Sequence, residues 1–134
     1  MPRLAVTLGD PRGIGPEILR KALAHPLDAE LTVIGADDQV ADIPNVTRIG
    51  LGPWQQGSGE RVDHARTLRA GRLTGHAIQA AVKLALAGEV DAIVTAPASK
   101  HALHLAGFPW PGHTEWLAHL AGDVDVAMML ASER

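Results

Sequence analysis

Short apolar runs alternate with a helical segment at the start of this chain, and this alternation restricts the fold more than any other feature. Residues 4–8 and 31–35 have no helical period, and each runs into a glycine, as buried strands do. Between them, Pro16 and Glu17 open a segment with apolar residues at helical spacing, which predicts a helix over residues 16–24. Strand, helix and strand in this length form a βαβ unit with a parallel sheet. The expected fold class is therefore α/β.

The rest of the chain continues this pattern, with a weaker signal in its middle. Residues 36–73 are rich in proline and glycine, which predicts a loop-rich segment with one strand-like run over residues 46–51. Thr74 is the expected N-cap of a helix that ends at Gly88, because apolar residues recur at helical spacing between them. Further along, the sequence predicts a strand over residues 91–95, helices over residues 99–106 and 113–120, and a last strand over residues 124–130.

The composition excludes several classes of protein. A chain of 134 residues can bury the core of one domain, and with no cysteine it has no disulfide, cysteine-ligated metal or thiol nucleophile. A formal net charge of -3 gives no electrostatic footprint for a nucleic-acid backbone. The apolar stretches are too short to cross a bilayer, and the first residues do not resemble a secretory signal. We therefore expect a cytoplasmic protein whose partner is a small molecule, with no nucleic acid and no membrane.

A glycine-rich segment over residues 9–17 lies where the first strand meets the first helix. Free backbone N–H groups at such a helix start favour an anion. The segment is not a Walker A loop, since no Lys-Ser/Thr pair follows the glycines, and Ile18 stands where the dinucleotide fingerprint needs its third glycine. Two interpretations stay open: an anion-binding loop, or a tight turn that needs flexible residues and nothing more.

Two further places carry candidate binding residues. Lys100 follows the strand over residues 91–95, and ligands of open α/β sheets settle outside the carboxyl ends of strands. His113 and Thr114 follow Gly112 at a helix start, where a titratable donor and a hydroxyl can grip an oxyanion. The alternatives are a solvent-exposed lysine and a threonine that simply caps its helix.

A histidine pair is a weak metal candidate. His101 and His104 lie three residues apart on a predicted helix and so share a face. A metal site needs more ligands, and the sequence offers no obvious third one. We therefore expect no metal site in this chain, and no catalytic residue is assigned.

Three motifs, in this order, closely resemble the 4-hydroxythreonine-4-phosphate dehydrogenase family. They are residues 9–17, residues 88–97 followed by Lys100, and residues 106–115. The resemblance extends through Leu130 and covers most of the chain.

The resemblance carries site residues over to this sequence. His113 and Thr114 match the family's substrate-binding pair, while Asp10 and Lys100 fall in family motifs as residues of the cleft without a named role. Arg12 departs from the small residue usual at that point of the family pattern.

The family resemblance also implies a fold and a reaction. It implies a three-layer α/β/α architecture like that of the isocitrate and isopropylmalate dehydrogenases, and a homodimer in vitamin B6 biosynthesis. The cofactors would be NAD or NADP and a divalent metal such as zinc, magnesium or cobalt. The alcohol of the small phosphorylated substrate would give a hydride to the nicotinamide, and the metal would assist decarboxylation.

The family's metal-binding histidines and other substrate residues match nothing up to Arg134. We therefore expect residues 1–134 to be the truncated amino-terminal α/β portion of a dehydrogenase, with the second half absent and with no activity by itself. Two alternatives stay open. One is a sister dehydrogenase that acts on threonate or erythronate phosphate, and the other is a non-catalytic binding or assembly module.

Overall fold

A computed structural model describes residues 1–54 and 63–133. In these residues four parallel strands form one sheet in the order β3-β2-β1-β4, as the βαβ pattern predicts. The elements in chain order are β1 (Arg3–Thr7), α1 (Gly15–Leu23), β2 (Glu30–Gly35), α2 (Asp37–Val40), β3 (Thr47–Gly50), α3 (Asp63–Leu86), β4 (Ala92–Thr95), α4 (Lys100–Leu105) and α5 (His113–Leu120).

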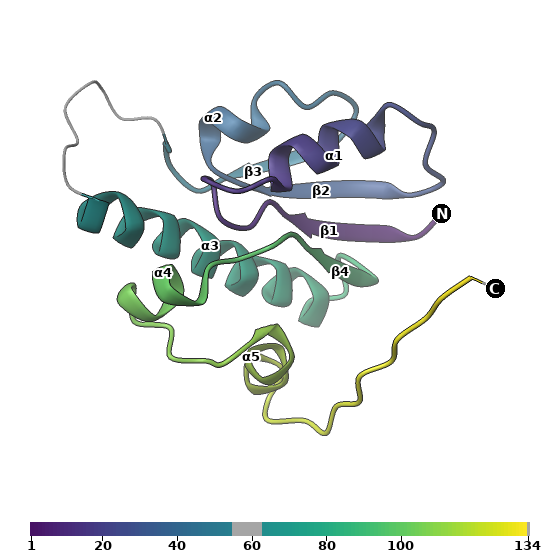
Figure 1. The fold of residues 1–134 in the computed structure, drawn as a ribbon. Helices are drawn as coiled ribbons and strands as arrows, with labels where there is room; N and C mark the ends of the chain where they lie inside the picture. The colour runs from purple at the N-terminus through teal and green to yellow at the C-terminus, as the bar shows by residue number, and fades with distance from the viewer. Residues whose placement is uncertain (55–62, 134) are drawn as a thin grey trace.

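Helices α1 and α3 cover opposite faces of the sheet (Figure 1). Side chains along a strand alternate between its two faces. Val6 therefore packs with Leu19 of α1, while Ala5 and Ile34 pack with Ala77 of α3. The expected three-layer α/β/α arrangement is confirmed.

Helices α4 and α5 pack on the outside of α3 rather than on the sheet (Figure 1). Ala102 of α4 is buried against Ala70 and Leu73 of α3, and Trp116 of α5 is buried against Ile78 of α3. The loop after β4 and the turn before α5 thereby come to the same side of the molecule. No helix in the described part of the chain is both long and apolar enough to span a membrane.

The predicted boundary of the long helix is wrong. Helix α3 begins at Asp63, eleven residues before the expected N-cap. Thr74 lies inside this helix, where its hydroxyl donates to the carbonyl oxygen of Ala70 at 2.7 Å, so it caps nothing. The loop-rich segment is correspondingly shorter than predicted, and it also contains α2. Residues 55–62 of that segment lie outside the described residues.

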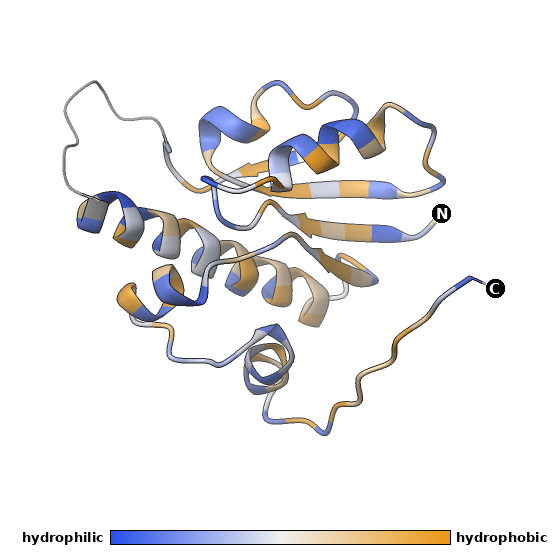
Figure 2. Cartoon of the chain, in the orientation of Figure 1, coloured by the Kyte–Doolittle hydropathy of each residue, from blue (hydrophilic) through white to orange (hydrophobic). Residues whose placement is uncertain are grey.

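The predicted last strand over residues 124–130 is also wrong. This segment runs away from α5 without pairing with any described strand. A strand exists through hydrogen bonds to a neighbour, and an apolar composition alone does not supply them. Figure 2 shows hydrophobic colours along this tail, and the exposed fractions of Met129 and Leu130 are 87% and 92%.

Candidate functional site

The carboxyl ends of β1 and β4 lie side by side at a point where the chain connections diverge. β1 leads through α1 to β2 on one side, while β4 flanks it on the other. Ligands of open α/β sheets bind in the crevice at such a switch point. The two loops are joined here, because the Asp10 N–H donates to the Pro97 carbonyl oxygen at 3.0 Å.

The glycines of the first loop meet the chain's own backbone. Gly9 has a φ of 71°, and a Cβ added there would overlap the carbonyl oxygen of Pro97. A Cβ added at Gly15 would overlap the carbonyl oxygen of Leu8. The Gly13 N–H donates to the Asp10 carbonyl oxygen at 2.9 Å. The tight-turn interpretation therefore accounts for these glycines, and the loop offers no cradle for a dinucleotide pyrophosphate.

Asp10 borders the crevice, but its carboxylate is already held. The Arg12 guanidinium donates through Nη2 to Oδ2 at 2.7 Å and through Nε to Oδ1 at 3.0 Å. The same guanidinium donates to the Thr67 hydroxyl of α3 at 3.0 Å. Hydrogen bonding to Asp10 raises the pKa of Arg12. Asp10, Arg12 and Thr67 therefore fasten the loop to α3, and this gives the unusual Arg12 a structural role.

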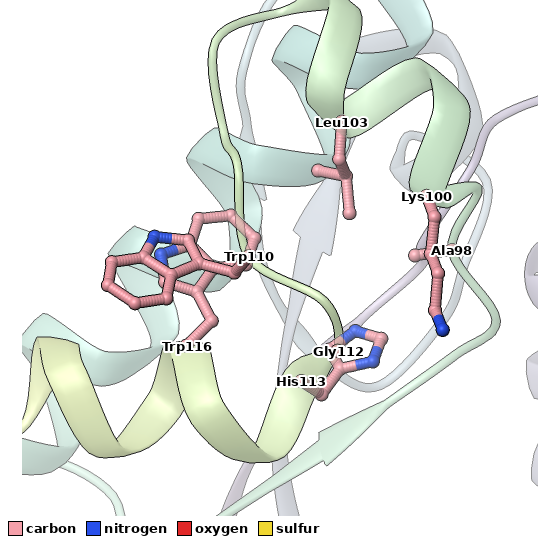
Figure 3. A pocket seen from close by; sticks show the side chains of 7 residues that line it. All are labelled: Ala98, Lys100, Leu103, Trp110, Gly112, His113 and Trp116. Carbon is pink, nitrogen blue, oxygen red and sulfur yellow. The ribbon is translucent and has the colours of Figure 1, made fainter.

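A small pocket lies beside this crevice, between α4 and α5. It measures about 60 Å³, and because a cavity of roughly 10–15 Å³ is enough to hold one water molecule, it can take a small polar group. Lys100 of α4 and His113 of α5 both line it (Figure 3). The lining residues are Ala98, Lys100, Leu103, Trp110, Gly112, His113 and Trp116.

His113 brings an unsatisfied polar atom to this pocket. Its Nε2 is buried and has no hydrogen-bond partner among residues 1–54 and 63–133. Burial lowers the pKa of His113, so the ring is neutral at pH 7 and has one N–H donor and one acceptor nitrogen. Buried polar atoms are ordinarily paired, and a ligand atom would satisfy this one. With the positive charge of Lys100 nearby, the pocket is suited to an anionic group.

The structure brings some of the predicted site residues together and separates others. Lys100 and His113 share one pocket, and Ala98 connects it to the crevice bordered by Asp10. Thr114 follows His113 in the first turn of α5, but it is not among the residues that line this pocket. The capping alternative for Thr114 is wrong, because Gly112 is the N-cap and the helix begins at His113.

Sequence analysis missed the aromatic wall of the pocket. Trp110 and Trp116 both line it, on the side away from Lys100 (Figure 3). The only signal was the spacing of the two tryptophans around the Gly112 turn, which does not by itself say where either ring points.

The described residues do not fit a metal ion. Within residues 1–54 and 63–133, no group of three or more histidine, aspartate or glutamate side chains is arranged to hold one. His104, one of the predicted pair, has its Nε2 at 3.1 Å from the carbonyl oxygen of Trp110.

Comparison with known proteins gives consistent results. The family described as "Pyridoxal phosphate biosynthetic protein PdxA" matches residues 14–134. The chain is 37% identical to a 4-hydroxythreonine-4-phosphate dehydrogenase of Synechococcus sp. (strain JA-3-3Ab), covering 98% of this chain and 43% of the relative. It is 39% identical to a D-threonate 4-phosphate dehydrogenase of Salmonella typhimurium, covering 98% of this chain and 47% of the relative.

A solved structure shares the fold. The crystal structure of a 4-hydroxythreonine-4-phosphate dehydrogenase from Burkholderia phymatum superposes with a TM-score of 0.78 at 30% identity. The match covers 98% of this chain and 47% of that one. The chain thus spans less than half the length of these relatives.

Proposed function

Because this chain belongs to the pyridoxal phosphate biosynthetic protein PdxA family, we propose that it forms the substrate-binding portion of a dehydrogenase acting on 4-hydroxy-L-threonine 4-phosphate. The observation that carries the proposal is the pocket that Lys100 and the buried Nε2 of His113 share. A phosphorylated amino acid supplies the anionic oxygens that such a pair attracts.

Each residue has a distinct part in this proposal. Lys100 supplies a positive charge for a phosphate or carboxylate oxygen. His113 hydrogen-bonds the same ligand through Nε2, which fixes the ligand's orientation. Thr114 contributes its hydroxyl to the part of the substrate that extends past the pocket. The ion pair of Asp10 and Arg12 holds the neighbouring loop in place without touching the substrate.

The cofactors belong to the same proposal. NAD or NADP would accept the hydride, and a divalent metal (zinc, magnesium or cobalt) would polarise the reacting oxygen. We propose that residues 1–134 are the amino-terminal portion of such a homodimeric enzyme of vitamin B6 biosynthesis. By themselves they would bind substrate without oxidising it. A cysteine-free sequence suits the reducing cytoplasm, the compartment that we propose.

D-threonate 4-phosphate is the second candidate substrate, because the Salmonella typhimurium relative carries that name at 39% identity. The two substrates share a phosphate and a hydroxylated four-carbon chain, and differ in an amino or a hydroxyl group. Lys100 and His113 suit the features that both share. The two candidates are separated by measuring the affinity of the same protein for each compound and comparing the two values. Erythronate phosphate belongs to the same comparison.

The proposal is tested by calorimetric titration of the chain with 4-hydroxy-L-threonine 4-phosphate, followed by an assay of NADH formation with NAD and a divalent metal. We expect binding that His113→Ala and Lys100→Ala each weaken by about tenfold, the loss of one charge-assisted hydrogen bond. Lys83→Ala, at the far end of α3, is the matched control and should bind as the parent does. Unchanged affinity in both site variants would contradict the proposed site.

The NADH assay separates the remaining alternatives. Binding without turnover is expected for a substrate-binding portion and also for a non-catalytic module. Adding back the missing portion of a family enzyme would then distinguish them, because only the former gains activity. Turnover by residues 1–134 alone would show that the inactive-portion proposal is wrong.

A further inference from the structure

Trp110 makes two specific contacts in addition to its packing against the core. Its indole ring stacks on the imidazole of His119, with ring centroids 4.4 Å apart and planes 30° from parallel. Its carbonyl oxygen lies 3.1 Å from Nε2 of His104. The first contact comes from α5 and the second from α4, so the two helices that flank the His113 pocket both hold Trp110.

His119 is itself oriented by a second residue. Its Nδ1 lies 2.9 Å from Oδ1 of Asp123, and because a carboxylate only accepts, Nδ1 carries the proton. Asp123 follows α5 with a φ of 57°, a left-handed conformation that turns the chain back beside the helix. Asp123 therefore orients His119, and His119 in turn holds the indole of Trp110.

The supported indole forms one wall of a very small pocket. Trp110 and Trp116 line the side of the pocket opposite Lys100 (Figure 3). The space measures about 60 Å³, and removal of the Trp110 indole, which forms one of its walls, would enlarge it. Trp116 is buried beside Phe108 at 5.0 Å between ring centroids, whereas Trp110 is only partly buried. Trp110 can therefore be replaced with less damage to the core.

We propose that Trp110 is a specificity-determining residue that limits the His113 pocket to a compact anionic group, and that His119 is the residue that positions it. This inference rests on the proposed function, since it concerns the same pocket. It predicts that the chain discriminates against ligands whose group at this pocket carries an additional carbon. It also predicts that the discrimination depends on the stacked ring at position 119 more than on the charge there.

The test compares the affinity for 4-hydroxy-L-threonine 4-phosphate with that for its homologue lengthened by one methylene. In Trp110→Ala, the ratio of the two affinities should fall by about tenfold, the usual discrimination for one methylene in a fitted pocket. His119→Ala should lower the ratio in the same direction. His119→Phe keeps a ring to stack and should restore it, which a loss of fold would not do. His25→Ala, after α1, is the histidine control.

A second measurement keeps this inference separate from the proposed function. The indole N–H resonance of Trp110, assigned by its loss in Trp110→Phe, should shift in His119→Ala and return towards its original position in His119→Phe. An unchanged resonance in His119→Ala, or an unchanged affinity ratio in Trp110→Ala, would overturn the inference. If the parent chain binds neither phosphorylated compound, the proposed function fails, and the indole resonance alone decides whether His119 positions Trp110.

Discussion

Replacing Gly71 with alanine is expected to destabilise this protein, although the same change in a helix is ordinarily favourable. Gly71 lies within α3, where the backbone of α4 crosses it. A Cβ added there would overlap the Ala102 carbonyl oxygen and lie 2.5 Å from its carbonyl carbon. It would also lie 3.0 Å from the Cβ of Ala106. The obstacle is backbone, so no change of side-chain rotamer relieves it.

The expected magnitude is the balance of two effects. Alanine in place of glycine inside a helix stabilises by about 0.5–1 kcal/mol. Forcing extra atoms into a packed contact costs about 1–3 kcal/mol. Ordinary van der Waals contact requires at least 3.4 Å, so the Ala102 carbonyl group of α4 must move away by more than an ångström. We therefore expect a net loss of about 1–2 kcal/mol, which lowers Tm by about 4–8 °C in a chain of this size.

Urea unfolding followed by circular dichroism measures this change. Gln79→Ala, at an exposed position of the same helix, is the control and should alter the unfolding free energy by less than about 0.5 kcal/mol. Since α4 carries Lys100, Gly71→Ala should also weaken substrate binding. A variant with a higher Tm than the parent would refute the reasoning, because α3 and α4 could not then be in backbone contact.

A second glycine of α3, Gly75, lies against a side chain instead of backbone. A Cβ added at Gly75 would lie 2.5 Å from Cζ of the Phe108 ring, which belongs to a side chain. Gly75→Ala should therefore destabilise the parent but recover in a Phe108→Ala background, where the ring is absent. No comparable substitution should rescue Gly71→Ala.

Three further predictions concern charged and titratable groups. Burial lowers the pKa of His113, so protons bind more readily to the unfolded chain, and the unfolding free energy should decrease as the pH falls below about 6.5. His113→Gln should flatten that part of a pH series of urea unfolding curves, and an unaltered slope would contradict the burial effect. Arg12→Ala removes the guanidinium from the buried Asp10 carboxylate, which keeps only the hydrogen bond from the backbone N–H of residue 12, and should cost about 1–3 kcal/mol in the same assay. Arg12→Lys should not fully restore the stability, because the contact of the guanidinium is bidentate. Hydrogen bonding to Arg3 lowers the pKa of Asp91 to about 2, so its stabilising effect should be present above pH 4 and disappear as the pH falls through about 2. Asp91→Asn should remove that component from an acid-unfolding curve, and an identical curve would show that the pair adds nothing.

The two central strands, β1 and β2, were predictable because most of their residues are buried on both faces of the sheet. Such strands are recognisable as continuous apolar runs, and residues 4–8 and 31–35 are confirmed as β1 and β2 within one residue at each end. The helices over residues 16–24 and 113–120 were equally clear, since a first-turn proline and a glycine turn mark their starts. These signals are local, so one sequence is sufficient to recognise them.

Elements that depend on distant contacts were not predictable in the same way. The part of α3 before Thr74, which was not predicted, contains Gly71, a residue that disfavours a helix locally but is required where α4 approaches. The opposite error occurred at residues 124–130, where a strand-like composition lacks a neighbouring strand among the described residues. In both cases tertiary contacts, rather than propensity, decide the structure.

The candidate site likewise has a part that the sequence predicts and a part that it does not. Lys100 and His113 follow turns that the sequence marks clearly, and the fold brings them to one pocket. The stacking of Trp110 on His119 joins a turn to a helix nine residues away, and it depends on how α5 packs against α3. No periodicity in the sequence contains that information.

The packing of the glycine-rich loop explains why the proposed anion site lies elsewhere. Gly9 and Gly15 allow this loop to pack against the chain's own carbonyl groups, and the Asp10 carboxylate beside it is paired with the Arg12 guanidinium. Because this ion pair is neutral as a whole and its donors are already used, the loop has no free positive charge to attract an anion. The positive charge and the unsatisfied nitrogen instead lie across the crevice, on Lys100 and His113. Substitutions in the loop should therefore act mainly on stability, while substitutions on α4 and α5 should act mainly on affinity.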